Sequence, residues 1–275
     1  MIRSKGFSLV ELAVALFIIA LLLAGALIPL STQIEVRNAA ETQRSLDSIR
    51  EAIIGFAQAN GRLPCPADGT KPAGAAGAGT EVLGGASPNT TCPNLFGVVP
   101  WTTLGVPETD RWGRRFSYQV SAIFADGTGL SSWNNPLPPP TGQSPACTAP
   151  VPAPTQSSFA LCSMGNLTLN TRSESTRAAT ALGLALPAVI ISHGKNGAGA
   201  YTPGGVTLPA PSGADETANA AHANATTTFY SRIQTPAASG CNDAGAGSFC
   251  EFDDIVVMIS SNVLMSRMVA AGKLP

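Results

Sequence analysis

The fold is decided by the stretch FSLVELAVALFIIALLLAGALIPL, residues 7–30, in which Glu11 is the one charged residue. An apolar run of about 20 residues is long enough to cross a bilayer as a helix. A carboxylate inside such a segment costs roughly 2.5–3.5 kcal/mol on insertion scales, so it requires a partner of opposite charge. The sequence therefore predicts a transmembrane helix over 7–30 that also serves assembly.

A short cationic leader, MIRSKG (1–6), precedes this stretch. The leader charge, Gly6, Phe7 and Glu11 together resemble the processing site of type IV prepilins, which type IV pilins share with type II secretion pseudopilins. The resemblance implies that a prepilin peptidase cuts between Gly6 and Phe7 and methylates the new amino group. The Phe7 ammonium and the Glu11 carboxylate then both lie in hydrocarbon, where pairing between neighbouring subunits neutralises them.

An ordinary secretory signal peptide is the alternative for this region, because Ala24-Gly25-Ala26 has the small residues of a cleavage site. Such a peptide has no use for a glutamate at the start of its apolar region. Arg3 and Lys5 place the N-terminus in the cytoplasm by the positive-inside rule. We therefore expect a single-pass inner-membrane protein whose later residues are periplasmic.

Helical periodicity continues beyond the apolar stretch, over residues 31–60. Apolar residues recur at three- and four-residue intervals and form one face, at Leu46, Ile49, Ile53 and Phe56. The Asn-Gly pair at 60–61 ends this amphipathic helix. Residues 61–275 are then a periplasmic globular head, and the predicted fold is α+β, with antiparallel strands packed on one long helix.

Apolar runs and turn residues predict the elements of the head. Strands are expected at 116–120, 187–192, 229–234 and 252–260, with a hairpin of 159–162 and 167–170. Helices are expected at 173–185 and at 262–271, the second with Ser261 as its N-cap. The Ala/Gly-rich segment 71–87 and the Pro-rich segment 136–154 are expected to be surface loops.

Six cysteines lie beyond the apolar stretch, on the side where an oxidising periplasm permits disulfides: Cys65, Cys92, Cys147, Cys162, Cys241 and Cys250. An even number without C-x-x-C spacing favours disulfides over zinc, but the sequence cannot select among the connectivities. Our hypothesis is sequential pairing, 65 with 92, 147 with 162 and 241 with 250. Each pair encloses a loop rich in Gly, Pro or Asn that has little else to hold it.

Three segments of the head extend the resemblance. DRWGRRFSY (110–118) is similar to the Asp-x-Trp-Gly strand motif of major pseudopilins, ISHGKNG (191–197) to their Ser-x-Gly-x-Asp-Gly loop, and FDDIVVMIS (252–260) to their closing strand. RLPCPA (62–67) and VLMSRMVAAGKLP (263–275) are similar to segments of longer bacterial prepilin-type proteins. Long insertions between these segments depart from the family pattern.

The same resemblance implies a calcium site, because the loop of major pseudopilins helps to hold that ion. The matching residues are Asn196, which replaces a ligating aspartate, and Asp253 and Asp254. Calcium prefers six to eight oxygen ligands, usually with more than one carboxylate. The alternative is a metal-free glycine-rich turn with Asn196 in the left-handed conformation. No other cofactor is expected.

Catalysis is not expected. Ser192 and His193 are adjacent, and with Asp215 or Asp243 they would complete a serine-type triad. No nucleophile elbow, metalloprotease helix, phosphate-binding loop or dinucleotide-binding loop accompanies them. His193 is therefore predicted to be a turn residue, and His222 an exposed loop residue.

Composition argues against a nucleic-acid partner. The net charge is −1 and the 16 basic residues are scattered along the chain. Three tryptophans are a candidate binding patch, although tryptophans near strand ends more often pack against the core: Trp101, Trp112 and Trp133.

These observations favour a structural subunit of a type II secretion pseudopilus or a related filament. Its expected partners are other pilin or pseudopilin subunits, the prepilin peptidase and an inner-membrane assembly platform. A minor pilin of a surface type IV pilus, acting in adhesion or initiation, is the nearest alternative. A membrane-tethered periplasmic binding protein that never polymerises is the third.

Overall fold

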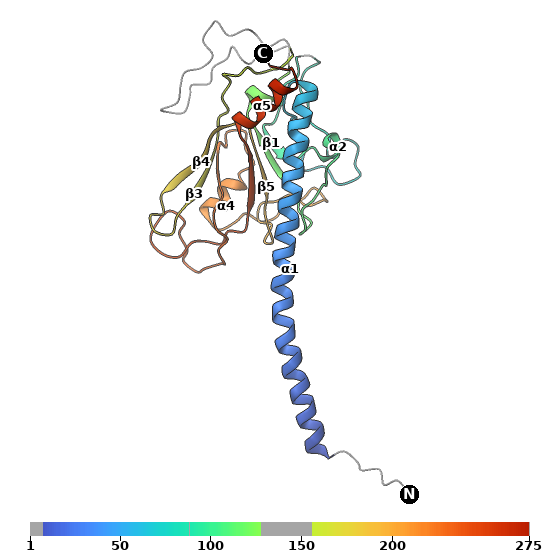
Figure 1. Cartoon of the computed structure of the whole chain (residues 1–275), viewed down its shortest axis with the longest axis vertical. Helices are drawn as coiled ribbons and strands as arrows, with labels where there is room; N and C mark the ends of the chain where they lie inside the picture. Colours follow the sequence, from blue (N-terminus) through green and yellow to red (C-terminus); the bar gives the residue numbers. More distant parts are fainter. Residues whose placement is uncertain (1–7, 88, 128–155, 275) are drawn as a thin grey trace. The chain divides into compact units, whose positions relative to one another are not determined.

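The computed structural model describes residues 8–87, 89–127 and 156–274, and within 22–32 it describes the backbone alone. The chain divides into two compact units, Met1–Glu41 and Thr42–Pro275 (Figure 1). The described part of the first unit is helix. The second unit is the head, which has its own core.

The helix α1 (Leu9–Asn60) contributes residues to both units. The prediction of one continuous helix up to about residue 60 is confirmed from Leu9 onward. The helix ends where Gly61 adopts a φ of 73°, a left-handed conformation that favours glycine. A Cβ atom at Gly61 would lie 2.0 Å from the carbonyl oxygen of Gln156, so close approach of the backbone also requires glycine here.

The head contains two small sheets, labelled in part in Figure 1. The first is antiparallel throughout and has the order β1 (Phe96–Val98), β2 (Ser117–Val120), β5 (Ala188–Ser192), β7 (Ile255–Ile259). The second has the order β4 (Ala179–Leu186), β3 (Leu167–Arg172), β6 (Thr228–Tyr230). The α+β class is confirmed, but β3 and β6 are parallel, so the expectation of antiparallel strands alone is wrong there.

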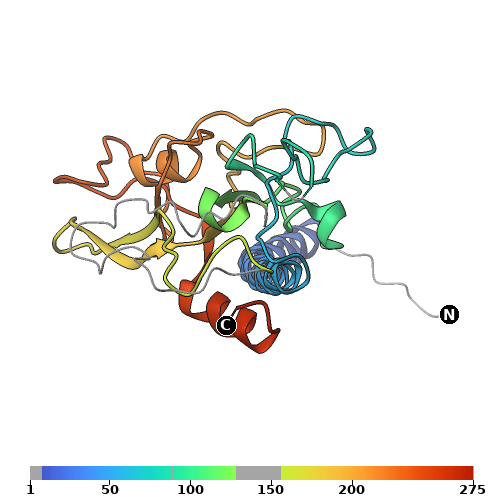
Figure 2. The ribbon, with the colours of Figure 1, turned by 90° about the horizontal axis from the view of Figure 1, so that it is seen from above.

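The described part of the head has four further helices: α2 (Trp101–Leu104), α3 (Ala122–Ala125), α4 (Ala214–Asn219) and α5 (Ser261–Ala270). Only α5 was expected from the sequence. Its N-cap is Ser260, one residue before the predicted Ser261, and the Ser260 hydroxyl accepts a hydrogen bond from the Val263 amide. Figures 1 and 2 show α5 beside the C-terminal end of α1, where the Gln58 amide donates to the carbonyl of Arg267 at 3.1 Å.

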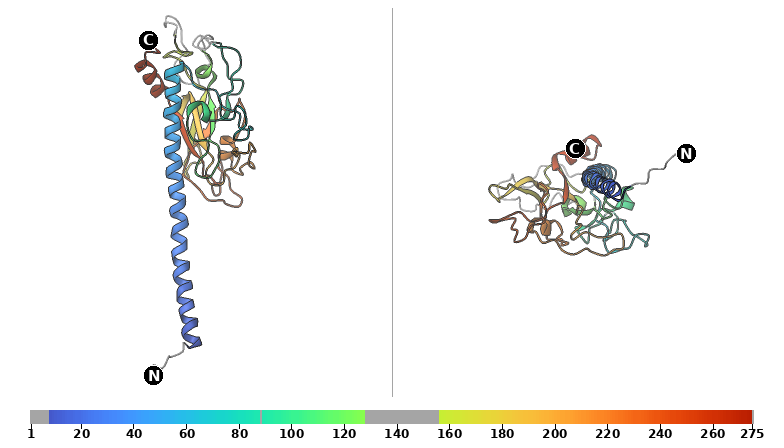
Figure 3. Two further views of the ribbon diagram at one scale, coloured as in Figure 1. Left: turned by 90° about the vertical axis from the view of Figure 1, so that its right-hand side faces the viewer. Right: turned by 90° about the horizontal axis from the view of Figure 1, so that it is seen from below.

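The main core lies between the C-terminal part of α1, the first sheet and α5 (Figure 3). Leu46, Ile49 and Ile53 are fully buried, as their spacing predicts. Ala57 continues this face and is also fully buried. The predicted fourth member, Phe56, is instead partly exposed, and the guanidinium of Arg62 lies 5.3 Å from its ring centre.

The predicted helix over 173–185 is wrong. A hydrogen-bonded turn occupies its start, with the Arg177 amide donating to the carbonyl of Ser173, and Arg177 has a φ of 56°. The rest is β4, which pairs with β3 through Leu169 and Gly183 and their neighbours. Ala and Leu favour helix locally, but pairing with a neighbouring strand overrides this preference.

The predicted hairpin is also wrong in its first half. Residues 159–162 form a turn, in which the Ala160 amide donates to the hydroxyl of Ser163. The Phe159 ring packs 4.8 Å from the Phe124 ring, so this apolar residue is buried without a strand. The true partner of β3 is β4, later in the chain.

Two predicted disulfides are confirmed. Cys65 bonds to Cys92 and Cys241 to Cys250. Cys162 is also disulfide-bonded, but its predicted partner, Cys147, lies outside the described residues. The pairing of 147 with 162 therefore stays a prediction. The Pro-rich segment 136–154 likewise lies outside the described residues.

Candidate functional site

The first candidate site is the start of α1. Gly6 and Phe7 lie outside the described residues, whereas Glu11 occupies the first turn of the helix. The Ser8 amide donates to Oε2 of Glu11 at 2.9 Å, and the Glu11 amide donates to the hydroxyl oxygen of Ser8 at 3.2 Å. This reciprocal pair is a capping box. Its Ser-x-x-Glu signal, Ser8 to Glu11, is present in the sequence. The sequence-based prediction used only the charge of Glu11 and missed its capping role.

The N-terminal part of α1 exposes its apolar side chains on every side. Each of the following is at least 51% exposed: Leu9, Val10, Leu12, Val14, Leu16, Phe17, Ile18, Ile19 and Leu21. Positions this closely spaced point in all directions around a helix. A contiguous apolar surface of this kind marks a protein or membrane contact. Among the described residues, no helix meets the length and hydropathy required of a membrane span.

The second candidate site is the loop that follows β5, where the sequence predicted calcium ligands. Its left-handed residues are Gly194 and Gly197, with φ of 57° and 62°, so the alternative expectation of a left-handed Asn196 is wrong. A Cβ atom at Gly194 would lie 2.5 Å from Oδ1 of Asp253, so glycine permits the close approach of this carboxylate. The Asn196 amide then donates to Oδ2 of Asp253 at 2.8 Å.

Three carboxylates converge beside this loop. Glu216, Asp253 and Asp254 each place an oxygen within 4.8 Å of the others. Burial and the charge of Asp254 raise the pKa of Glu216 to about 8, and burial raises the pKa of Asp253 to about 6. Crowded, buried carboxylates resist ionisation unless a cation balances them. Asp253 and Asp254 were predicted, but Glu216 of α4 was not.

The donor atoms suit a hard cation such as calcium. The three carboxylates provide several oxygens, and Oδ1 of Asp253 is buried without a hydrogen-bond partner among the described residues. Asn196 differs from the prediction, because its Oδ1 accepts from the Ala198 amide at 2.8 Å and its Nδ2 faces Glu216 at 3.2 Å. The acidic cluster therefore relies on Glu216 for the oxygen that Asn196 was expected to offer.

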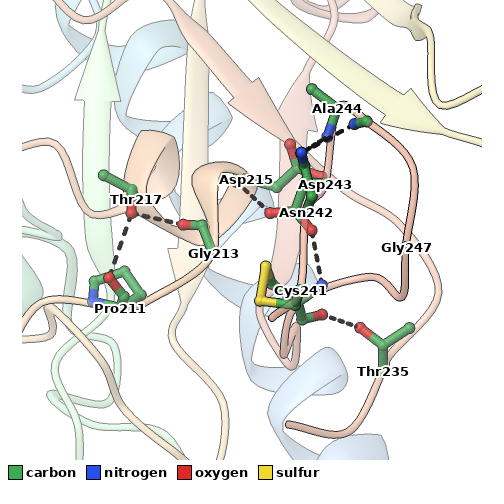
Figure 4. Close-up of a disulfide and its surroundings, with 12 residues drawn as sticks. Pro211, Gly213, Asp215, Thr217, Thr235, Cys241, Asn242, Asp243, Ala244 and Gly247 are labelled. Atoms are coloured by element: carbon green, nitrogen blue, oxygen red, sulfur yellow. Dashed lines mark hydrogen bonds between the residues drawn. A yellow bond between two sulfur atoms is a disulfide. The ribbon is translucent and has the colours of Figure 1, made fainter. Parts of the chain in front are cut away.

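A disulfide-closed loop is hydrogen-bonded to the start of α4, the helix that carries Glu216 (Figure 4). The Asp243 carboxylate lies inside this loop and accepts from the amides of Asp215 at 3.1 Å and Cys250 at 3.0 Å. Arg232 bridges the loop and the helix, with 3.0 Å contacts to both Asp215 and Asp243. The Cys241–Cys250 bond therefore supports the start of the helix that carries a cluster carboxylate.

The Asp-x-Trp-Gly segment, residues 110–113, supports the glycine-rich loop that follows β5. Oδ1 of Asp110 accepts from the amides of Trp112 and Arg114, both at 2.9 Å, and this closes the turn before β2. The other oxygen accepts from the hydroxyl of Ser192 at 2.7 Å. Asp110 thus joins the turn to the end of β5, where the glycine-rich loop begins.

The serine-type triad considered from the sequence does not form. Ser192 donates to Asp110, while Asp215 and Asp243 pair with Arg232. His193 instead contacts the Ser117 hydroxyl at 2.8 Å and Oδ1 of Asp254 at 3.6 Å. These three residues, Ser117, His193 and Asp254, are a second serine–histidine–aspartate arrangement. Ser117 and His193 are both fully buried, so a substrate cannot reach them.

The structure also tests the candidate tryptophan patch and the predicted exposure of His222. Trp101 faces the Arg115 guanidinium, which lies 4.6 Å from its ring, and Trp133 lies outside the described residues. Trp101 is therefore engaged in packing. The expectation of an exposed His222 is wrong, because its ring is stacked between those of Phe96 and Tyr201.

Comparison with protein families gives one match. Residues 1–27 match the prokaryotic N-terminal methylation motif. The chain carries a prepilin-type N-terminus. The resemblance of the leader, Phe7 and Glu11 to type IV pilin-like proteins is thus confirmed. Neither the comparison with curated proteins nor that with solved structures gives a match.

Proposed function

We propose that this pilin-like protein is a structural subunit of a type II secretion pseudopilus or a closely related filament. The prepilin peptidase cuts between Gly6 and Phe7, and residues 7–30 anchor the precursor in the inner membrane with the head in the periplasm. Other subunits and an assembly platform then draw it into the filament. The observation that supports this proposal most is the methylation motif at residues 1–27, followed by a helix with an exposed apolar surface.

In this proposal Glu11 neutralises the amino group of Phe7 on a neighbouring subunit. Its carboxylate is exposed, and it accepts a hydrogen bond from the amide of Ser8 just before the helix. A carboxylate accepts several hydrogen bonds, so the capping bond and an intermolecular ion pair are compatible. The two roles of Glu11 are nevertheless separable by mutation.

Glu11→Gln separates them, because glutamine also completes a capping box but carries no charge. We expect the variant to be cut and inserted in the membrane normally, while its incorporation into filaments falls at least about tenfold. Removing one partner of a buried ion pair costs roughly 3–5 kcal/mol, which supports this size. Sheared filaments and membranes are compared by immunoblot, and mass spectrometry verifies the start at Phe7.

Glu41→Gln is the matched control. It makes the same substitution in the same helix, at a partly buried residue whose 2.8 Å contact with the exposed Arg37 is an i,i+4 pair. Such a pair contributes little, so this variant should assemble normally. Assembly of Glu11→Gln at the control level would defeat the ion-pair proposal and leave capping as the role of Glu11.

Calcium binding is a second proposed function, favoured by the buried cluster of Glu216, Asp253 and Asp254. Full-length protein in detergent micelles should gain thermal stability with about 5 mM calcium, since ligands that bind the folded state alone stabilise it. Glu216→Gln should abolish most of this gain, whereas Glu174→Gln, an exposed position, should retain it. No stabilisation of the unaltered protein by calcium would remove this proposal and leave the filament proposal intact.

A further inference from the structure

A pocket of about 310 Å³ lies in the head, among the segment that follows Cys65, β1 and the loop around His222. Its polar lining residues are Asp68, Thr70, Asn94, Tyr201, His222 and Asn224. The volume falls at the small end of the range of about 300–1,000 Å³ found for ligand pockets. None of these residues belongs to the N-terminal helix or to the carboxylate cluster.

One wall of the pocket is a fixed stack of three rings. His222 lies between Phe96 and Tyr201, with ring centres 4.9 and 4.8 Å apart and both planes inclined by 22°. Gly69 supports the stack, since a Cβ atom there would lie 2.5 Å from the Tyr201 ring. Oδ1 of Asn224 accepts from the Leu95 amide at 2.7 Å and ties the His222 loop to β1. The wall is therefore preformed.

His222 presents an unpaired acceptor. Burial, followed by the charge of His193, lowers the pKa of His222, so its ring is neutral at neutral pH. The backbone of Gly199 hydrogen-bonds the ring, and Nε2 is buried without a hydrogen-bond partner among the described residues. A buried polar atom left unpaired costs about 1–3 kcal/mol. A ligand that donates a hydrogen bond to Nε2 would recover this cost.

Asp68 presents a second acceptor. The Thr70 hydroxyl and amide both donate to Oδ1, at 2.7 and 2.9 Å, and these bonds lower the pKa of Asp68. The carboxylate is therefore ionised, and its Oδ2 has no hydrogen-bond partner within the described ranges. The positive charges of Lys71 and Arg115 lower this pKa further.

These charges select the chemistry of the ligand. The charge of Asp68 opposes an anion, and the nearby Lys71 opposes a cation, whereas the charge of Arg115 is balanced by Glu108 at 2.7 Å. A wholly apolar ligand would leave the acceptors on Asp68 and His222 unpaired. A neutral molecule with several hydroxyl donors and an apolar C–H surface satisfies both the acceptors and the aromatic wall.

We infer that the pocket formed by Asp68, Tyr201 and His222 binds a single sugar ring or a comparable neutral polyol. Hydroxyl groups of the ring donate to Asp68 and to His222, and its C–H edge contacts the side chains of Phe96 and Val82. The inference is independent of the filament proposal.

The test uses the full chain in a detergent without sugar headgroups. D-glucose, D-galactose and N-acetyl-D-glucosamine are titrated separately and followed by saturation-transfer difference NMR. We expect saturable binding of at least one of them with a Kd of about 1–10 mM. Asp68→Asn and His222→Phe should each weaken it at least about tenfold, or by ~1.4 kcal/mol. His222→Phe retains an aromatic ring in the stack, and thermal unfolding verifies that both variants fold.

Glu174→Gln, at an exposed turn outside the pocket, is the control and should bind like the unaltered protein. The inference is overturned if none of the three sugars binds saturably up to about 50 mM, well above the expected Kd. Binding by the Asp68→Asn or the His222→Phe variant with the affinity of the unaltered protein would also overturn it. So would tighter binding of choline than of any sugar, since the ligand would then be a cation.

Discussion

The two parts of α1 differ in what covers their apolar residues. The large apolar side chains from Leu9 to Leu21 are at least half exposed, whereas Leu46, Ile49 and Ile53 are fully buried in the head. The first part is apolar in every direction, and the second has one apolar face and one charged face. The head covers the apolar residues of the second part, whereas those of the first part are exposed in the described chain. One helix is thus specified for two different environments.

This contrast predicts different effects for the same substitution in the two parts. Ile53→Ala should lower the free energy of unfolding of the head by about 2–5 kcal/mol, because it leaves a cavity in the core. Ile18→Ala should change that free energy by less than about 0.5 kcal/mol, as is usual for exposed positions. All three tryptophans belong to the head, so their fluorescence during urea denaturation in micelles reports its unfolding alone.

The two isoleucines are matched in residue type and in helix, which makes each the control for the other. Equal losses at both positions would show that the N-terminal part of α1 also packs in the core. The contrast between the two parts would then be wrong. Ile18→Ala is in turn expected to affect retention in the membrane and contacts between subunits.

The pH dependence of stability sharpens the contrast, because its source lies in the head. The pKa of Glu216 rises from 4.5 to about 8 on folding. Between these values the folded, metal-free protein holds a proton that the unfolded chain has lost. The stability of the folded protein therefore falls as the pH rises through this window. The pKa of Asp253 rises from 3.8 to about 6 on folding, so this residue lowers the stability in the same way between these two pH values. Thermal unfolding should occur at a lower temperature at about pH 8 than at about pH 5.

Glu216→Gln removes the larger of these two contributions and should flatten the dependence. Added calcium should also oppose it, because the ion binds ionised carboxylates and is stabilising at the higher pH. A metal-free protein that grows more stable from about pH 5 to 8 would contradict the prediction, since it would mean that the cluster favours ionisation.

The sequence was sufficient for features that neighbouring residues determine. Residue spacing gave α1 and its buried face, the apolar run before Ser192 gave β5, and two of the disulfides enclose short segments of the chain. The start of α5 was predicted within one residue. In each case the signal and the structure lie within a few turns or one loop.

Features that depend on distant segments could not be predicted in the same way. β4 has a helix-like composition and becomes a strand because β3 is available to pair with it. Glu216 lies 37 residues from Asp253 in the chain, and the disulfide-supported loop helps to hold its helix at the cluster. His222 gave no signal of burial, since its stacking partners come from two other segments.

The smallest predicted effect concerns the N-cap of α5, which packs on the buried part of α1. Ser260→Ala should cost about 1 kcal/mol of head stability, because the Val263 amide loses its acceptor. Hydrogen exchange of the amides in the first turn of α5 should accelerate in this variant. Ser261→Ala is the matched comparison, since the Ser261 hydroxyl donates to the carbonyl of Ala185 at 2.9 Å and caps no helix. If hydrogen exchange instead accelerates only in Ser261→Ala, then Ser261 is the N-cap, as the sequence predicted, because the capping residue is the one that protects the first-turn amides.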